Sequence, residues 1–172
     1  MSKIKKADVS KSNVKIDKKS ISTNVGLCFN FREFQKQSIS ITGFNNCFLD
    51  SDECLNFISK AIDKLKYIGG CTNFSELLFN ENMHCHKIAQ NQGMLDHVLR
   101  KYGYPREKID EIFEGEIYQV KVAAGNPAGR MVFYLIDGHV IVPLFVDTNH
   151  HLYRDKKRGY DNNLGAKKYS LP

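Results

Sequence analysis

Runs of hydrophobic residues, rich in β-branched and aromatic side chains, recur in the second half of the chain and are typical of strands. Strand-like runs cover residues 116–123 and 130–147. Asp137-Gly138 interrupts the second run and supplies the positive φ angles of a two-residue hairpin turn. The pattern therefore predicts three successive strands in an antiparallel meander. Pro143 lacks a backbone donor, which favours an edge position or a bulge for the last strand.

The first half of the chain predicts short strands followed by helices. Alternation over residues 25–31 and 38–42 indicates two strands that pair with each other, or one strand broken by a turn. Asp50 and Glu53 resemble a capping box, and apolar residues then recur at helical spacing up to Gly69-Gly70.

Three shorter helices are expected after this long one. The first begins at Asn73, the second carries the apolar residues of segment 95–102, and Pro105 opens the third. Strand, helices and a final meander give the predicted fold class: α+β, an antiparallel sheet with a C-terminal three-strand meander packed against a few helices.

The 172 residues and their 42% hydrophobic content suit one domain with a real core. We expect a basic tail over 1–24, a single α+β domain over 25–153 and a basic tail over 154–172. No apolar run is long enough to cross a bilayer and no signal peptide is recognisable, so the sequence predicts a cytoplasmic protein without a membrane partner. Five cysteines without paired spacing argue against a disulfide framework and against a cysteine zinc site.

The candidate catalytic residues lie where the last predicted strand ends. Counting across the two-residue turn pairs Arg130 with Phe145, which brings its guanidinium towards His150, His151 and Tyr153. A guanidinium binds phosphate, and a histidine with a pKa of about 6.5 moves protons at neutral pH. Transfer from an RNA 2′-hydroxyl needs a proton acceptor, a proton donor and positive charge near the phosphorane, without any metal or other cofactor. These four residues are the catalytic candidates.

A structural role for the same segment stays open. Asp147 and Asn149 could form a local hydrogen-bonding corner that satisfies backbone donors, with the histidines exposed to solvent. Neighbouring residues of a strand point to opposite faces, so at most one of His150 and His151 is expected to be catalytic.

Two further groups of residues favour contact with nucleic acid. Arg154, Lys156, Lys157 and Arg158 form a basic cluster beside the histidines, and we predict that they bind RNA. The triplet His84-Cys85-His86 has no second spaced pair of ligands, so a polar loop is favoured over a metal site. A milder interpretation places His84, His86 and Lys87 on the same RNA-facing surface.

Residues 116–158 resemble the RelE/YoeB group of toxins from bacterial toxin–antitoxin pairs. The resemblance rests on Gly129-Arg130-Met131-Val132-Phe133-Tyr134, the turn Asp137-Gly138, and His150-His151-Leu152-Tyr153. It implies a RelE-like fold, a phosphate-binding Arg130, an acid/base His150 or His151, a terminal Tyr153, and Lys156 and Lys157 as RNA contacts. It also implies cleavage of mRNA in the ribosomal A site and an antitoxin partner. The ending Asp-x-Asn-His-x-Leu-Tyr is similar to that of small proteins of bacteria and mobile elements.

Two hypotheses of different classes follow. The first is a RelE-like RNA-binding protein that acts as a metal-independent endoribonuclease in a toxin–antitoxin or phage-defence setting. The alternative is a non-catalytic module of a phage or mobile element that docks nucleic acid or protein through its basic C-terminus. A metal-binding role for His84 and His86 ranks third.

Overall fold

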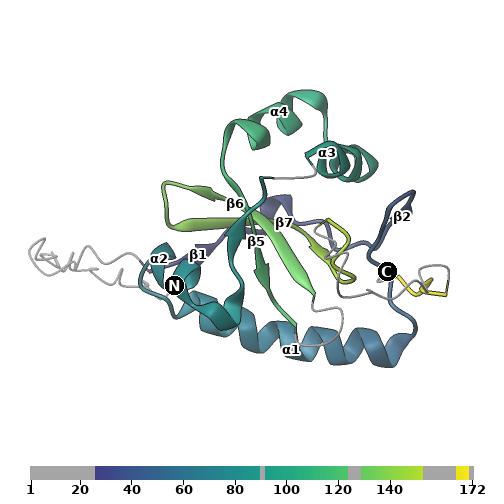
Figure 1. Cartoon of the computed structure of the whole chain (residues 1–172), viewed down its shortest axis with the longest axis horizontal. Helices are drawn as coiled ribbons and strands as arrows, with labels where there is room; N and C mark the ends of the chain where they lie inside the picture. The colour runs from purple at the N-terminus through teal and green to yellow at the C-terminus, as the bar shows by residue number, and fades with distance from the viewer. Residues whose placement is uncertain (1–25, 90–91, 124–128, 153–165, 171–172) are drawn as a thin grey trace, which may run out of the picture.

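The computed structural model describes residues 26–89, 92–123, 129–152 and 166–170 of the chain. Its centre is a five-stranded sheet with the strand order β1-β7-β6-β5-β4 (Figure 1). The strands of this sheet are β1 (Cys28–Phe29), β4 (His86–Lys87), β5 (Ile117–Lys121), β6 (Arg130–Ile136) and β7 (Val140–Asp147). Strands β2 (Ser40–Ile41) and β3 (Phe44–Asn45) form a separate hairpin. The predicted α+β class and the C-terminal β5-β6-β7 meander are confirmed.

The sheet is mixed, so the prediction of a purely antiparallel sheet was wrong. Strand β1 pairs in parallel with β7, through Cys28 opposite Val140 and Phe29 opposite Ile141. The expected strand over 25–31 is cut short because the chain turns into a 3-10 helix, η1 (Phe31–Glu33). For this reason β1 and β2 do not pair with each other.

The helices follow the predicted boundaries closely. Helix α1 (Ser51–Gly69) begins where the Asp50 carboxylate accepts the Glu53 N–H at 2.8 Å. Helix α2 (Phe74–Phe79) is capped in the same way by Asn73. The chain continues through η2 (Glu81–Met83), α3 (Gln92–Lys101) and α4 (Arg106–Glu114). Local sequence determines where α1 and α2 begin, because a side-chain oxygen of the capping residue accepts one of the first unpaired N–H groups of each helix.

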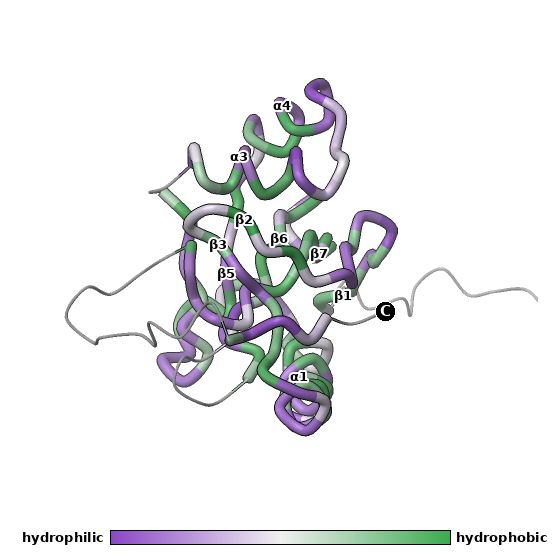
Figure 2. Tube along the Cα trace, turned by 90° about the vertical axis from the view of Figure 1, so that its right-hand side faces the viewer, coloured by the Kyte–Doolittle hydropathy of each residue, from purple (hydrophilic) through white to green (hydrophobic). Residues whose placement is uncertain are grey.

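The sheet separates two hydrophobic clusters. Figure 2 shows α3 and α4 on one side of the strands and α1 on the other. Alternation along β6 divides its side chains accordingly: Val132 and Tyr134 pack with α3 and α4, whereas Met131 and Phe133 pack in the cluster that contains α1 and α2 residues. Both faces of the central strands are thus covered, which explains why their runs are almost continuously apolar.

The β6–β7 hairpin has the predicted turn but a different register. Asp137 and Gly138 both have positive φ, of 51° and 72°. The strands nevertheless pair Ile136 with Val140, which makes a three-residue loop, and an irregularity at Val132/Phe133 adds one more residue on β7. Arg130 therefore faces Asp147 rather than Phe145.

Of the two positions predicted for Pro143, the structure shows the bulge and not the edge strand. It lies opposite Phe133 beside the irregularity, in a strand that has β1 on one side and β6 on the other. A bulge tolerates a residue without an N–H in the middle of a sheet, because one residue of the bulged strand is left out of the ladder.

The segment 166–170 lies against the body of the protein. Tyr169 and Phe48 exchange two backbone hydrogen bonds, of 2.8 and 3.0 Å. The Lys167 ammonium contacts the Glu53 carboxylate at 2.7 Å. This part of the predicted basic tail is therefore attached to the start of α1. None of the described helices is long and apolar enough to span a membrane.

Candidate polar site at the end of the sheet

A compact turn follows β7 and is organised by the Asp147 carboxylate. One carboxylate oxygen accepts the His151 N–H at 2.9 Å and the other accepts the Leu152 N–H at 2.8 Å. Asp147 is completely buried. Burial raises the pKa of Asp147 to about 6, although the two backbone donors and the nearby Arg130 guanidinium act in the opposite direction. The predicted local corner is confirmed for this residue.

The two histidines of the corner are buried, which contradicts the expectation that a corner would leave them exposed. The His151 Nδ1 accepts the backbone N–H of Asn45 at 2.8 Å, and its ring packs edge-on against Phe44. An accepting Nδ1 requires a neutral imidazole with its proton on Nε2. His150 has a φ of 56°, a left-handed conformation that turns the chain back over the sheet.

Asn149 connects the corner to the first half of the chain. Its amide nitrogen donates to the backbone carbonyls of Asn45 and Cys47, at 2.8 and 3.1 Å. Its amide oxygen accepts from the Lys167 ammonium at 2.9 Å. Asn149 thus satisfies backbone acceptors instead of the donors that the sequence suggested, and it holds three distant segments together.

Arg130 belongs to a polar row across the sheet next to this corner. It lies opposite Asp147 on β7 and opposite Lys121 on β5. Alternation places Arg130 on the face of Val132, which is the face that packs against α3 and α4. Arg130 is 8% exposed, whereas Lys121 is partly exposed. Two positive side chains and one carboxyl group therefore share one end of the sheet.

His86 continues this polar surface on the outermost strand. Its Nε2 lies 2.6 Å from the side-chain nitrogen of Gln119, its partner across the β4–β5 pair, and its Nδ1 lies 3.1 Å from the carbonyl of His84. Burial lowers the pKa of His86, and the charge of Arg130 lowers it further. The two contacts fit a neutral imidazole that donates through Nδ1 and accepts through Nε2.

The structure brings some of the predicted site residues together, and the other predicted site residues are not among those it describes. Arg130, His150 and His151 all lie at or beside the buried corner. Tyr153, Arg154, Lys156, Lys157 and Arg158 lie outside the described residues.

The proposed histidine and lysine surface is only partly correct. Lys87 pairs with the Glu116 carboxylate at 2.8 Å, next to Tyr118 on the opposite face of the sheet from Gln119. His86 therefore shares the surface of Arg130, whereas Lys87 does not. Within the described part of the chain no group of three histidine, cysteine, aspartate or glutamate residues could hold a metal ion.

Sequence reasoning missed Asn45, Gln119 and Lys121. The polar residues of β5 were detectable, because Gln119 and Lys121 recur at the period of two that starts with the buried Ile117. Asn45 carried no such pattern. Its role depends on the approach of the β2–β3 hairpin to the corner, more than a hundred residues away in the sequence.

The comparisons with known proteins identify a family but no relative of known activity. A family model described as "Uncharacterised protein UU032" matches residues 30–171, and the chain belongs to this family. No curated protein and no solved structure matches. The family match includes the corner and the segment 166–170 that packs beside it.

Proposed function

We propose that this member of the family is an RNA-binding protein that holds the phosphate backbone at the corner end of its sheet. The observation that carries the proposal is the position of Leu152. This residue is 1% exposed and packs in the cluster that contains Val132. It fixes the chain two residues before the basic segment begins at Arg154.

The charges fit a phosphate backbone. Arg154 follows the buried Leu152 by two positions in the sequence. The basic segment holds Arg154, Lys156, Lys157 and Arg158 against the single Asp155. Lys121 and Arg130 lie on neighbouring strands, at the end of the sheet where β7 runs into the corner that ends at Leu152. Positive side chains along one surface are the usual basis of sequence-independent binding to phosphates.

The sequence of the segment favours single-stranded RNA. Tyr153 and Tyr160 flank the basic cluster. Aromatic rings next to lysine and arginine stack on unpaired bases while the charges follow the backbone. We therefore propose that the segment 153–160 and Lys121 both contact the RNA.

The geometry supports binding more directly than it supports catalysis by His151. Its Nδ1 is occupied by the Asn45 N–H and its ring is packed against Phe44, which gives it a role in holding the corner. Cleavage of mRNA, the RelE-like fold, a ribosomal setting and an antitoxin partner are what the resemblance predicts. They are separate hypotheses that rest on Arg130, His150 and Tyr153.

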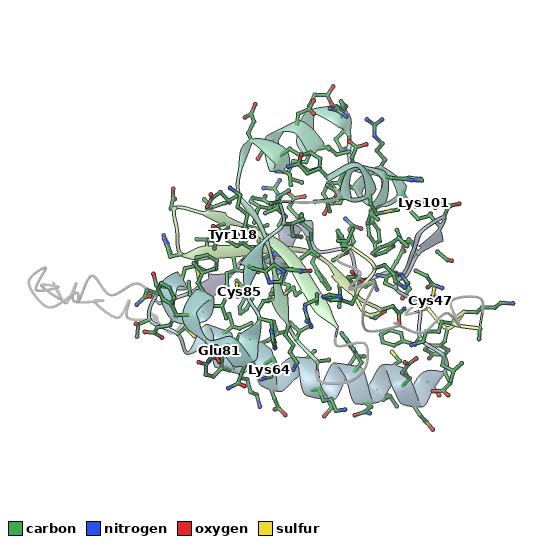
Figure 3. The ribbon with its side chains drawn as sticks, in the orientation of Figure 1. Cys47, Lys64, Glu81, Cys85, Lys101 and Tyr118 are labelled. Carbon is green, nitrogen blue, oxygen red and sulfur yellow. The ribbon has the colours of Figure 1, made fainter. Side chains whose placement is uncertain are left out.

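Binding can be tested by fluorescence anisotropy with a labelled single-stranded RNA at several salt concentrations. We expect Lys156→Glu/Lys157→Glu/Arg158→Glu to weaken binding strongly. The slope of log affinity against log salt concentration should become shallower by about 0.7 for each phosphate that the variant no longer neutralises. The matched control is Lys60→Glu/Lys64→Glu/Lys66→Glu on α1, on the opposite side of the sheet (Figure 1, and Figure 3 for Lys64). Equal binding by both triple variants would refute the proposed surface.

Cleavage is tested separately, with and without a chelator, and by expression in bacteria while growth and total RNA are followed. Tyr153→Phe removes one hydroxyl, and Arg130→Lys keeps the charge but removes the guanidinium fork. A RelE-like nuclease predicts growth arrest and RNA loss for the wild type and weaker effects for both variants. RNA binding with no arrest and no cleavage favours the non-catalytic module, whereas absence of RNA binding favours a protein partner for the basic segment.

A further inference from the structure

A separate cavity lies on the other face of the sheet, between α1, η1 and the strands β6 and β7. It has a volume of about 220 Å³. Its walls are almost entirely carbon and include aromatic side chains of η1 and its flank, apolar side chains of α1 and a methionine of β6: Phe31, Phe34, Phe57, Ile58, Leu65 and Met131. Phe31 and Ile62, which also lines the cavity, are each about half exposed. The cavity is therefore open to solvent at one side.

The two ends of the cavity differ in polarity. The Asn30 N–H donates to the Ile141 carbonyl, which places the neighbouring Phe31 beside the first half of β7. Towards the other end, the Asn46 amide donates to the Val146 carbonyl. Five residues of strand separate these two carbonyls, or about 16 Å.

The end near Val146 carries the polar groups of the wall. Ser38 lies there, because the next residue in the chain donates its N–H to the Asn46 side chain at 2.7 Å. Lys36, two residues earlier, is exposed at the rim and forms no ion pair with any described residue. Thr148 lines the same end and is 9% exposed, and its hydroxyl makes no hydrogen bond within the described part of the chain.

We propose that this cavity binds a medium-chain fatty acid, with the hydrocarbon between α1 and the sheet and the carboxylate at Lys36 and Ser38. A carbon-lined space with a lysine at its rim matches a ligand that has one apolar part and one anionic head. The volume of the cavity limits the length of the hydrocarbon part of the ligand. Since a cavity of about 150 Å³ holds benzene, 220 Å³ and an open mouth suit about eight to ten carbons.

The charge of the head group follows from the rim. An ammonium group and a hydroxyl donate hydrogen bonds, and a carboxylate accepts them. A cationic amphiphile of the same length has the wrong charge, and an alcohol lacks the charge altogether. The preference for decanoate over decanol and over decyltrimethylammonium therefore measures the contribution of Lys36.

The test uses the full chain with these three compounds, each below its micellar concentration, in isothermal titration calorimetry. We expect decanoate to bind one to one. Lys36→Glu should weaken decanoate about fivefold, the effect of reversing one exposed charge, and leave decanol unchanged. Ala61→Phe, on the α1 wall of the cavity, should abolish binding of both compounds. Lys60→Glu, which changes a neighbouring lysine outside the cavity, is the matched control and should bind like the wild type.

Methyl NMR of the wild type locates the ligand without relying on any variant. Decanoate should shift the methyl resonances of Ile58, Ile62 and Met131 and leave those of Ile109 and Ile112, in the cluster on the other face, unchanged. Absence of decanoate binding would overturn the proposal. Shifts confined to the other face, or unchanged binding by a folded Ala61→Phe, would overturn it as well, and equal affinity for decanoate and decyltrimethylammonium would exclude the role of Lys36.

Discussion

Replacement of Asp147 by asparagine tests the energetics of the corner most directly. The two side chains have nearly the same shape, but the amide nitrogen of asparagine cannot accept a hydrogen bond. Of the His151 and Leu152 N–H groups, which donate at 2.9 and 2.8 Å in the wild type, one must lose its acceptor inside a fully buried site. A buried unsatisfied donor costs about 1 to 3 kcal/mol.

The position of Arg130 increases the loss of stability expected for Asp147→Asn. It lies opposite Asp147 in the β6–β7 pair and is 8% exposed, so that the substitution also removes the negative group nearest to it in register. We expect Asp147→Asn to lower the free energy of unfolding at pH 7 by at least about 2 kcal/mol. For a domain of this size that corresponds to a decrease in Tm of about 4 to 8 °C.

The measurement is chemical denaturation followed by circular dichroism, with thermal unfolding as a second observable. Asp63→Asn is the matched control, because Asp63 is exposed on α1. The control should lie within about 0.5 kcal/mol of the wild type. An Asp147→Asn protein as stable as this control would refute the assignment of the carboxylate as the group that holds the corner.

The pH dependence of the same pair of proteins tests the state of the carboxyl group. Burial raises the pKa of Asp147 to about 6. A carboxyl group with a raised pKa in the folded protein binds its proton more tightly there than in the unfolded chain. The stabilisation that comes from this tighter proton binding is complete below about pH 4 and is lost as the pH rises through 6. A shift of about two units corresponds to about 3 kcal/mol. The stability difference between wild type and Asp147→Asn should therefore be greater at pH 4 than at pH 7, and the opposite order would show that the backbone donors and Arg130 outweigh burial.

Three further substitutions probe the elements that position the corner and the cavity, each measured by denaturant unfolding. Gly129→Ala drives a Cβ into the Phe57 ring and should cost about 1 to 3 kcal/mol, whereas a neutral result would mean that the ring moves freely. Tyr102→Phe removes the hydroxyl that accepts from Asn46 at 2.9 Å and donates to a backbone carbonyl at 3.0 Å, and we expect a loss of about 1 to 3 kcal/mol. Asp50→Ala removes the cap of α1 and should cost about 1 kcal/mol, with unchanged stability as the contrary outcome.

Features that depend on neighbouring residues were predictable. The start of α1 at Asp50 follows from a side chain that caps the backbone three residues later. The left-handed Asp137 and Gly138 follow from a dipeptide that tolerates positive φ. The corner at Asp147 follows from the ability of a short carboxylate to accept nearby N–H groups. Each of these features closes within about five residues, so the chain's local chemistry is sufficient to specify it.

The register of the hairpin was only half determined by sequence. A turn dipeptide indicates where the chain reverses, but the three-residue loop and the bulge near Pro143 shift Arg130 by two positions, from Phe145 to Asp147. That shift depends on how the side chains of both faces pack, because each register places a different set of residues in the core.

Pairings between distant segments were decided by the tertiary structure alone. The parallel addition of β1 to β7, the approach of Asn45 to His151 and the return of Lys167 to Glu53 join residues that no local pattern relates. They form because each buried polar group needs a partner and finds it wherever packing brings one. The sequence by itself determined the elements, the turn and the polar composition of the corner, while only the three-dimensional packing buried the histidines and opened the cavity beneath the sheet.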